Sequence, residues 1–243
     1  MHAHAFAPAL MLALLLFPPA PAQEPWAVAP RAYRREFEND RVLVTRVHYE
    51  PRERVPAHDH PDNATVYVYL RDSGPVRFVH TGDEAFTLVR PAVRAGGFRL
   101  SRGAKETHVV ESLTDAPTDF LRVELKGWTD AERRSFLKRF PPEPGRTTRT
   151  SQRLKFENER ARVWRVTCAA RGRCVGLGGG AGAASLLVAL TPARLRTAGG
   201  GTEVSLALGE TLWSEPGGAP SFANASNAPA EFLRIDLKAA PVR

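Results

Sequence analysis

The stretch "FENDRVLVTRV" at residues 37–47 recurs as "FENERARVWRV" at residues 156–166. A second stretch, "APTDFLRVELK" at 116–126, recurs in the same order as "APAEFLRIDLK" at 228–238. The two separations, 119 and 112 residues, are nearly equal, which is typical of an internal repeat. The chain is therefore a tandem duplication whose second copy has lost about seven residues between the matching stretches.

Both copies consist of short strand-like runs separated by turn residues. In the first copy, "TVYVYLR" at 65–71 and "FLRVELK" at 120–126 alternate or run apolar over the length of a strand. Twenty prolines, nineteen glycines and the lack of a long helical periodicity indicate many turns and little helix. The sequence predicts an all-β protein of two small barrels, residues 34–126 and 151–238.

The segment between the copies, residues 127–150, is predicted to be a linker. Its first part, "DAERRSFLKRF" at 130–140, is suited to a short helix. Its second part, "PPEPGRTTRT" at 141–150, opposes helix and strand alike because of its prolines and Gly145. We therefore expect a short helix and then an irregular segment to join the two barrels.

Two histidines one residue apart precede a predicted strand of the first copy, in "VPAHDHPDNATVYVYL" at residues 55–70. In an extended chain, side chains at i and i+2 point to the same face, so His58 and His60 can approach one metal ion from one strand. The pattern alone is weak evidence, because His2 and His4 have the same spacing at the start of the chain. On this pattern alone the two histidines are either metal ligands or polar residues at the edge of a strand.

The first copy resembles the cupin superfamily, in which an H-x-H motif precedes a strand and a third histidine follows a turn. The first motif corresponds to His58, Asp59 and His60 before "PDNATVYVYL". The second corresponds to "AGGFRLSRGAKETHVVES" at 95–112, where His108 is the third histidine. With both copies counted, the chain resembles the two-domain, or bicupin, proteins, which implies a double-stranded β-helix, or jelly-roll barrel, in each half.

The resemblance implies one divalent metal ion bound by His58, His60 and His108. Iron, manganese, nickel and zinc are all compatible with such a set of ligands. The glutamate of the family would fall at Ala64 or Thr65, and neither residue is a carboxylate. Three neutral imidazoles would leave positions on the ion open to water or to an anionic ligand.

Other polar residues of the first copy are secondary candidates. Asp62, Thr65 and Glu106 are close to the motifs in sequence and could support the histidines, and either carboxylate could replace the missing glutamate. His48 and His80 lie in strand-like runs outside the motifs. We interpret both as ordinary strand residues. For His80 alone, a side chain that points into the same barrel is the alternative.

The second copy lacks all three candidate ligands. Alignment of the repeat places Leu177 and Gly179 opposite His58 and His60, and places Pro220 opposite His108. The glycine-rich tract "GLGGGAGAAS" at 176–185 replaces the H-x-H loop. Loss of the three ligands together predicts that the second barrel is a scaffold without a metal site.

The start of the chain resembles a secretory signal peptide. Residues 1–22 carry no charge, contain an apolar stretch from Phe6 to Phe17 and end in Ala20-Pro21-Ala22. The apolar stretch is shorter than the roughly 20 residues that cross a bilayer. We expect cleavage after Ala22, a secreted or periplasmic protein, and no membrane span once the signal is removed.

The two cysteines, Cys168 and Cys174, flank the turn-like "AARGR" in the second copy. An oxidising compartment allows a disulfide to persist, and a disulfide between them would staple a hairpin. Two free thiols, or half of a metal site, are the alternatives. We predict the disulfide because export places the chain in such a compartment.

Charge and missing motifs narrow the classes of function. The formal charge of +8 comes from 29 Arg and 5 Lys, which are spread thinly, so nucleic-acid binding is not expected. No Ser/His/Asp or Cys/His arrangement and no phosphate-binding loop is evident, and no catalytic residue is assigned. Two classes remain: a small-molecule metalloenzyme with dioxygenase-type or Lewis-acid chemistry, and a non-catalytic ligand- or metal-binding or structural module.

Overall fold

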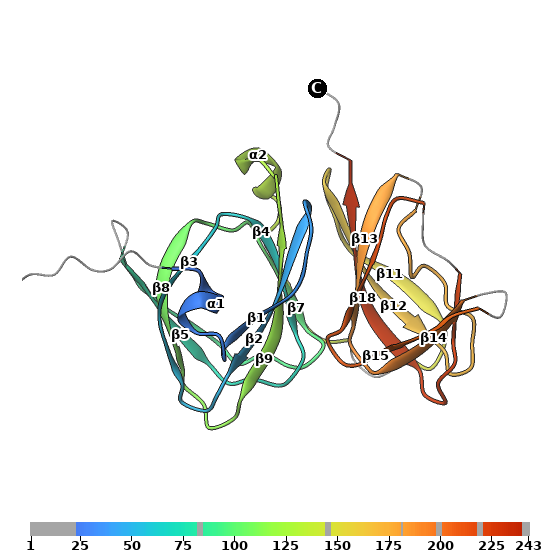
Figure 1. The fold of residues 1–243 in the computed structure, drawn as a ribbon, viewed down its shortest axis with the longest axis horizontal. Helices are drawn as coiled ribbons and strands as arrows, with labels where there is room; N and C mark the ends of the chain where they lie inside the picture. Colours follow the sequence, from blue (N-terminus) through green and yellow to red (C-terminus); the bar gives the residue numbers. More distant parts are fainter. Residues whose placement is uncertain are drawn as a thin grey trace, which may run out of the picture.

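The computed structural model describes residues 23–81, 85–143, 147–180, 182–197, 201–217 and 221–239. The predicted signal peptide, residues 1–22, and Pro220 lie outside the described residues. Within the described part, no helix has the length and apolar character needed to cross a membrane. Figure 1 shows two β-barrels side by side, the first in blue to green and the second in yellow to red.

Two antiparallel sheets form the first barrel. The larger has the strand order β1-β2-β9-β4-β7-β10, and the smaller has the order β3-β8-β5-β6. A one-turn helix, α1 (Pro25–Val28), precedes them and contacts β3 and β1. The strands are β1 (Tyr33–Glu38), β2 (Val42–Tyr49), β3 (Arg54–His60), β4 (Ala64–Tyr69), β5 (Val76–Thr81), β6 (Thr87–Arg90), β7 (Phe98–Ser101), β8 (Glu106–Ser112), β9 (Thr118–Leu125) and β10 (Lys138–Phe140).

The second barrel repeats this plan with shorter sheets. Its larger sheet has the order β11-β12-β18-β13-β16, and its smaller sheet has the order β15-β14-β17. The strands are β11 (Ser151–Glu157), β12 (Ala161–Cys168), β13 (Ala183–Ala189), β14 (Ala193–Thr197), β15 (Glu203–Leu206), β16 (Thr211–Ser214), β17 (Phe222–Asn224) and β18 (Ala230–Lys238). The prediction of an all-β chain with two tandem barrels is confirmed.

The duplication is visible in the register of the strands as well as in the sequence. In the first barrel β2 pairs with β1 on one side and β9 on the other, as β12 pairs with β11 and β18 in the second. The pairing of β1 shifts between Arg35 and Phe37, and that of β11 shifts at the corresponding place, between Leu154 and Phe156. A bulge is a local feature of the backbone, so its recurrence shows that the two copies fold in the same way.

Strand alternation gives the larger sheet of the first barrel two buried faces. On β4, the side chains of Val66 and Val68 are fully buried in a core that also contains residues of the second barrel. The alternate residues Tyr67 and Tyr69 line a cavity inside the first barrel. Because successive strand residues point to opposite faces, one strand serves both the contact between barrels and the interior of its own barrel.

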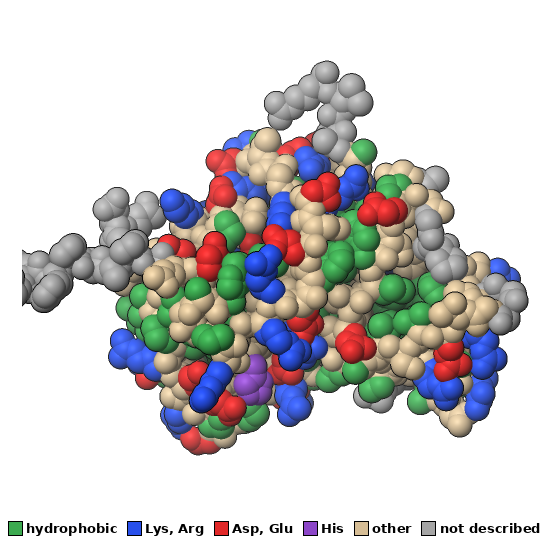
Figure 2. Space-filling model, in the orientation of Figure 1, with side chains coloured by type: hydrophobic (Ala, Val, Ile, Leu, Met, Phe, Trp, Pro, Cys, Tyr) green, Lys and Arg blue, Asp and Glu red, His purple; other side chains and the backbone are tan. Residues whose placement is uncertain are grey.

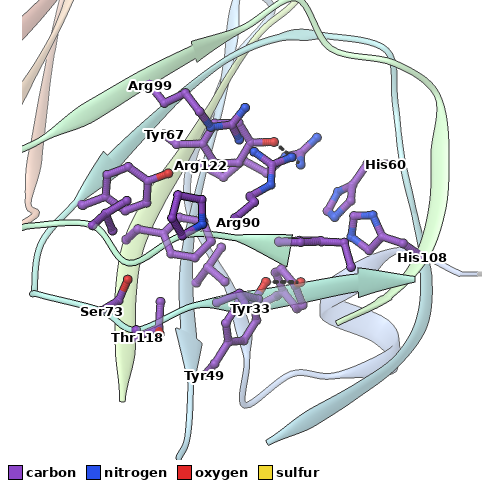
Figure 3. Close-up of a pocket in the computed structure, with 18 of the residues that line it drawn as sticks. Tyr33, Tyr49, His60, Tyr67, Ser73, Arg90, Arg99, His108, Thr118 and Arg122 are labelled. Carbon is purple, nitrogen blue, oxygen red and sulfur yellow. Dashed lines mark hydrogen bonds between the residues drawn. The ribbon is translucent and has the colours of Figure 1, made fainter. Parts of the chain in front are cut away.

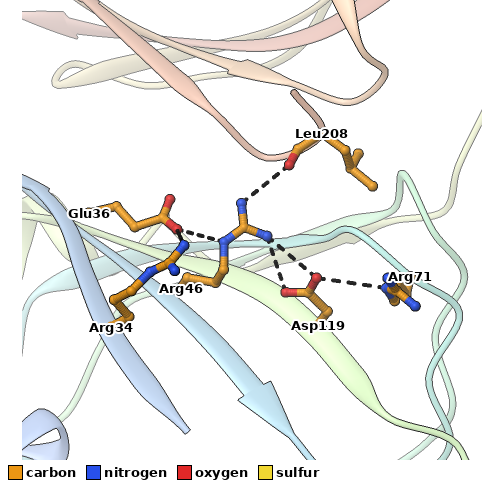
Figure 4. A network of polar contacts seen from close by, with 6 residues as sticks. All are labelled: Arg34, Glu36, Arg46, Arg71, Asp119 and Leu208. Atoms are coloured by element: carbon orange, nitrogen blue, oxygen red, sulfur yellow. Dashed lines mark hydrogen bonds and ion pairs between the residues drawn. The ribbon is translucent and has the colours of Figure 1, made fainter. Parts of the chain in front are cut away.

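The two barrels meet through an apolar core and a few polar contacts. The core takes its residues from the larger sheets of both barrels, and Trp213 of β16 packs 5.9 Å from Phe37 of β1, measured between ring centres. Arg46 of β2 donates to the Leu208 carbonyl oxygen of the second barrel at 3.2 Å (Figure 4). Glu36, at 2.6 Å from the Arg46 Nε, neutralises its charge. The barrels are therefore packed together, not loosely tethered.

The predicted linker is more structured than the sequence indicates. The short helix is present as α2 (Asp130–Arg133), which begins with a capping box between Thr129 and Glu132. Its continuation is not helical, because Lys138–Phe140 forms β10 and pairs with β7 at the edge of the first barrel. The first barrel thus extends beyond its predicted end at residue 126 and includes part of the segment expected to be linker.

The sulfur atoms of Cys168 and Cys174 are joined in a disulfide. Cys168 is the last residue of β12 and is fully buried in the apolar core of the second barrel. The bond ties the end of this strand to the loop that follows it.

On the outside of the molecule, in the face shown in Figure 2, Lys and Arg side chains are interspersed with Asp and Glu over both barrels.

Candidate metal centre

Three histidines converge inside the first barrel. His58 of β3 pairs directly with His108 of the neighbouring β8, and His60 lies two residues along β3, on the same face. One nitrogen of each ring lies within 4.8 Å of the others. The exposed fractions of His58, His60 and His108 are 0%, 4% and 2%, so all three rings are removed from solvent. The structure thus brings together the three residues that the sequence analysis selected.

Hydrogen bonds orient the His58 ring. Its Nδ1 lies 2.8 Å from the Pro56 carbonyl oxygen, which can only accept, so the proton of the neutral ring is assigned to Nδ1. Nε2 then carries a lone pair, 3.0 Å from the Tyr33 hydroxyl, which in turn lies 2.8 Å from the hydroxyl of Tyr49. A backbone acceptor on the nitrogen opposite the ligating atom is the usual arrangement for a metal-binding histidine.

Burial keeps His58 and His60 neutral. Desolvation lowers the pKa of His58 to about 4, and the neighbouring His108 and Arg122 act in the same direction against the hydrogen bond to Pro56. Desolvation also lowers the pKa of His60 well below its ordinary value, assisted by the charge of Arg122. A metal ion requires the neutral imidazole, so these two side chains are in the ligating form at pH 7.

A carboxylate lies beside the histidines. Glu106 precedes His108 by two residues on β8, opposite His60, and its Oε2 lies 3.8 Å from the His108 Nδ1. Burial alone would raise the pKa of the Glu106 carboxyl, but interactions with His108, Arg122 and His80 outweigh it and lower the pKa to about 2. Glu106 is therefore an anion at neutral pH, close enough to act on the metal centre.

His80 departs from the interpretation as an ordinary strand residue. The pairing of β5 with β8 sets His80 opposite His108, and its Nδ1 lies 3.5 Å from the Glu106 carboxylate. Its ring is 6% exposed and stacks on Phe86 with centres 4.1 Å apart. His80, Glu106 and His108 form a second group of potential ligands that shares His108 with the first. His48, by contrast, has a side chain that is 38% exposed, as expected.

Two of the supporting residues that the sequence analysis listed do not contact the histidines. The Asp62 side chain is 61% exposed and pairs with Arg133 of α2 at 2.8 Å. Thr65 is buried, but its hydroxyl donates to the Asn63 carbonyl oxygen at 2.9 Å. Both lie beyond the end of β3, whereas Glu106 shares a strand face with His108. Of the carboxylates considered, only Glu106 is placed to replace the missing glutamate.

A small cavity of about 50 Å³ extends from the histidines into the barrel (Figure 3). His60, His108 and Glu106 line one part of it, and the remaining wall is aromatic and basic. Sequence analysis missed the basic residues, which come from three different strands. They are Arg90 of β6, Arg99 of β7 and Arg122 of β9. The alternation of β9 around Arg122 was a usable signal, because an arginine between Leu121 and Val123 must face the other side of the sheet.

The residues present fit a divalent first-row metal ion. Such ions are bound by neutral imidazole nitrogens, and burial supplies the neutral form at His58 and His60. The hydrogen bond of the His58 Nδ1 to Pro56 leaves the lone pair on Nε2, and one ring nitrogen of each histidine lies within 4.8 Å of the others. The buried Nδ1 of His108 has no hydrogen-bond partner among the described residues. A buried nitrogen without a partner is unfavourable in a protein interior, and a bound ion or ligand is one way to satisfy it.

No protein-family model matches this chain, and no curated protein matches it. Solved structures do match over most of its length. AerE from Microcystis aeruginosa is 10% identical with a TM-score of 0.58 and covers 86% of this chain and 98% of its own. A cupin 2 conserved barrel domain protein from Leptotrichia buccalis is 10% identical, with a TM-score of 0.51 and coverages of 85% and 88%. The oxalate decarboxylase of Lactobacillus farciminis, solved with formate, is 11% identical, with a TM-score of 0.54 and coverages of 82% and 78%.

These likenesses establish the fold and not the activity, because the identities are low. The alignments span both barrels of this chain, and the matched structures include cupins. The resemblance noted in the sequence is therefore supported at the level of the fold: the chain has a cupin-like fold with two barrels in tandem.

Proposed function

We propose that this two-barrel cupin is an exported, metal-dependent enzyme that acts on a small molecule inside its first barrel. One observation carries the proposal: three buried imidazoles converge, and two of them, His60 and His108, line a cavity, so that an ion bound by the three would face a space for a ligand. The ion would be a divalent first-row metal, and iron, manganese, nickel and zinc all suit the donor set.

His58, His60 and His108 would hold the ion, and Glu106 is placed to complete or support the set. An ion with three protein ligands keeps positions open, and when bound it supplies Lewis-acid polarisation of an oxygen or carbonyl group. Tyr33 would fix the rim of this site, since its hydroxyl contacts His58 and is itself held by Tyr49. Burial raises the pKa of the Tyr33 hydroxyl well above its ordinary value, so this group remains a neutral hydrogen-bond partner.

Glu106 is the carboxylate best placed to contact a bound molecule. It lines the cavity and, because its pKa is depressed to about 2, it is an anion at neutral pH that accepts hydrogen bonds from a bound molecule but is a weak base. The aromatic wall beyond it excludes water from the same space, which strengthens the electrostatic interactions of any charged ligand there. Glu106 and the ion would thus act on opposite parts of one small molecule.

Export is the second part of the proposal. The uncharged apolar residues 1–22 support it, and so does the disulfide between Cys168 and Cys174, because disulfides persist mainly in oxidising compartments. Protein isolated from its native source should begin at Gln23. A soluble protein that retained Met1 would contradict export.

Metal analysis of purified variants tests the centre. His58→Ala, His60→Ala and His108→Ala should each remove most of the bound metal measured by inductively coupled plasma mass spectrometry. His48→Ala is the matched control, since His48 belongs to the same barrel but its side chain is 38% exposed and is not part of the histidine group, and it should keep full occupancy. Metal retained at wild-type level in all three variants would contradict the assignment of the ligands.

Turnover tests the enzymatic part. The metal-loaded protein is incubated with small chelating acids and phenols while oxygen consumption and product formation are followed. Glu106→Gln should retain metal within a few-fold and lose turnover by about 100-fold or more, because it removes the anionic hydrogen-bond acceptor beside the ion. A protein that binds metal and small molecules with no turnover of any of them would instead be the non-catalytic binding module.

A further inference from the structure

We propose that the molecule bound in the first barrel is a small carboxylate, which enters through a cavity lined by arginines and is held by Arg90 and Arg99. This inference rests on the proposed function only for the ion at the inner end of the cavity. The observations behind it concern the opposite end, where basic side chains gather and carboxylates are lacking.

Arg99 is buried, Arg90 is partly buried, and neither has an ionic partner among the described residues. Arg99 is 8% exposed, and its Cζ lies 3.9 Å from the centre of the Tyr67 ring. The Arg90 Cζ lies 4.8 Å from the centre of the Phe78 ring. The buried Nε atom of each arginine has no hydrogen-bond partner, and no carboxylate among the described residues pairs with either side chain. Aromatic faces stabilise a cation but do not neutralise it, so the charge remains available to a ligand.

The balance of charge around the inner cavity is positive. Its charged lining consists of Arg90, Arg99, Arg122 and Glu106. Arg122 is neutralised by Glu124, whose Oε1 lies 2.9 Å from the Arg122 Nε. Two arginines then remain against one glutamate, an excess of one positive charge, and a divalent ion on the histidines would increase it. A buried excess of positive charge is unfavourable without a counter-ion, which makes an anionic ligand the expected occupant.

A larger outer cavity of about 310 Å³ adjoins the inner one and shares Arg90 and Arg99 with it. Arg94 and Arg139, both exposed, line the outer cavity as well. None of the described residues that line this outer space is Asp or Glu. A hollow lined by charges of one sign raises the local concentration of ligands of the opposite sign. The two shared arginines therefore lie on the path of an anion from solvent to the histidines.

Size and surroundings favour a carboxylate over other anions. The inner cavity of about 50 Å³ admits a compact molecule only. A guanidinium presents a planar fork of donors that matches a carboxylate. The rings of Tyr67, Phe78 and Phe120 line the same cavity and would contact a carbon skeleton, which inorganic phosphate and sulfate lack. A short organic acid, with its carboxylate on the arginines and its other end toward the histidines, satisfies both parts of the wall.

Isothermal titration calorimetry with malonate tests the proposal, and malonamide serves as the uncharged analogue of nearly the same shape. Both are titrated into metal-free and metal-loaded wild-type protein at pH 7, with inorganic phosphate and sulfate as further probes. Malonate should bind both forms of the protein, and malonamide should bind at least tenfold more weakly. Phosphate or sulfate binding as tightly as malonate would overturn the assignment to a carboxylate.

Variants test the two arginines. Arg90→Gln and Arg99→Gln should each weaken malonate binding by about 10- to 100-fold, because each removes charged donors from a buried site. Arg77→Gln is the matched control: Arg77 lies on β5 of the same barrel, but its side chain is 42% exposed and pairs with Glu111. Arg99→Lys keeps the charge and should restore part of the affinity, and it replaces Arg99→Gln if that variant does not fold.

The outcomes separate this inference from the metal proposal. Weaker malonate binding in the arginine variants, with metal content and melting temperature near those of wild type, supports the anion site. Malonate binding in a wild-type protein that takes up no metal would contradict the proposed metal centre and leave the anion site standing. Unchanged malonate affinity in all arginine variants, or no malonate binding to either form of the wild-type protein, would overturn the inference.

Discussion

The two barrels place different side chains at equivalent positions of the same sheet. In the first barrel Tyr67 of β4 lies between Arg99 of β7 and Arg122 of β9. In the second barrel Leu187 of β13 lies between Leu212 of β16 and Arg234 of β18. The arginine is kept in both, while a tyrosine and an arginine of the first barrel are leucines in the second.

The segment that carries His58 and His60 differs in the same way, because an apolar residue of the second barrel takes the place of a polar one. Leu177, which the repeat aligns with His58, is 6% exposed and belongs to the apolar core that fills the second barrel. The retained Arg234 pairs with Asp236 and donates to the Gly178 carbonyl oxygen at 3.0 Å, so the protein itself neutralises its charge. One barrel uses its interior for a polar cavity, and the other fills that interior with side chains.

The face that the barrels share has not diverged in this way. Val66 and Val123 of the first barrel and Leu186 and Ile235 of the second lie in one apolar core. Because the faces of a strand alternate, a duplicated sheet can keep its outer face for packing while its inner face changes freely. The comparison supports the prediction that the second barrel is a scaffold that buries this shared face, and it agrees with our proposal that the ligand site belongs to the first barrel.

The sharpest test of this comparison is metal stoichiometry. One equivalent of divalent metal should bind per chain, because the described interior of the second barrel offers no group of histidines or carboxylates that could hold an ion. Native mass spectrometry of the metal-loaded protein measures the number directly. His108→Ala should lower the affinity for the metal by about 100-fold or more, because a residue that binds the ion directly contributes more than the residues that support it. Two equivalents per chain would break the distinction between the barrels.

Leu187→Ala tests the scaffold role of the second barrel. Leu187 is 2% exposed in its core, so truncation should lower the free energy of unfolding by about 2–5 kcal/mol. Urea unfolding measures the loss. The metal content of the protein that remains folded should equal that of wild type, since Leu187 contacts only the second barrel. A folded Leu187→Ala protein that had lost its metal would show that the barrels are not separable in function.

The histidines of the first barrel should make the metal-free protein sensitive to acid. The pKa of His58 is depressed from 6.5 to about 4, so the unfolded chain takes up a proton first as the pH falls. The contribution of His58 to the free energy of unfolding is therefore complete above pH 6.5. It is lost between about pH 6.5 and 4 and amounts to on the order of 3 kcal/mol. His60 and His80 shift in the same direction and add to the loss.

Urea unfolding at several pH values between 4.5 and 7.5 measures this effect. The depressed carboxyl pKa of Glu106 changes the free energy of unfolding only below about pH 4.5, outside the range measured. His58→Gln has no titrating group at this position and should show a shallower dependence on pH. An equal slope in wild type and His58→Gln would contradict the buried, neutral state of His58.

Much of the fold and part of the candidate site follow from the sequence. The repeat and the strand-like alternation predict two barrels, and the spacing of His58, His60 and His108 resembles a known motif closely enough to select them. The strand β10 could not be predicted, because Lys138–Phe140 is too short for a pattern and gains its order from pairing with Phe98–Ser101.

The basic wall of the cavity could be predicted only in part. The alternation around Arg122 indicates which face its side chain takes, and Arg99 lies within the second histidine motif, but only the pairing of strands shows that Arg90, Arg99 and Arg122 line one cavity with the histidines. The choice between Asp62 and Glu106 was within reach. Glu106 is two residues from His108 on one strand and must share its face, whereas Asp62 follows the end of β3, where alternation no longer applies.

The smallest expected effect concerns the position where β2 and β12 end. Tyr49 pairs with Thr118 in the first barrel, and Cys168 pairs with Ala230 at the corresponding place in the second. Tyr49 contacts Tyr33 beside the histidines, while Cys168 forms the disulfide. Replacement of Cys168 and Cys174 together by alanine should lower the free energy of unfolding by about 2 kcal/mol, because the bond closes only a short loop.

Equilibrium unfolding in urea measures this loss, and the same measurement on wild-type protein with and without reductant is the control. Metal content should not change, since the disulfide lies in the core of the barrel that has no histidines among its described residues. A double alanine variant as stable as wild type would show that the packing of the second barrel, and not the cross-link, holds the end of β12. If the variant lost its metal as well, the first barrel would depend on this distant strand end, and the separation of scaffold from site would fail.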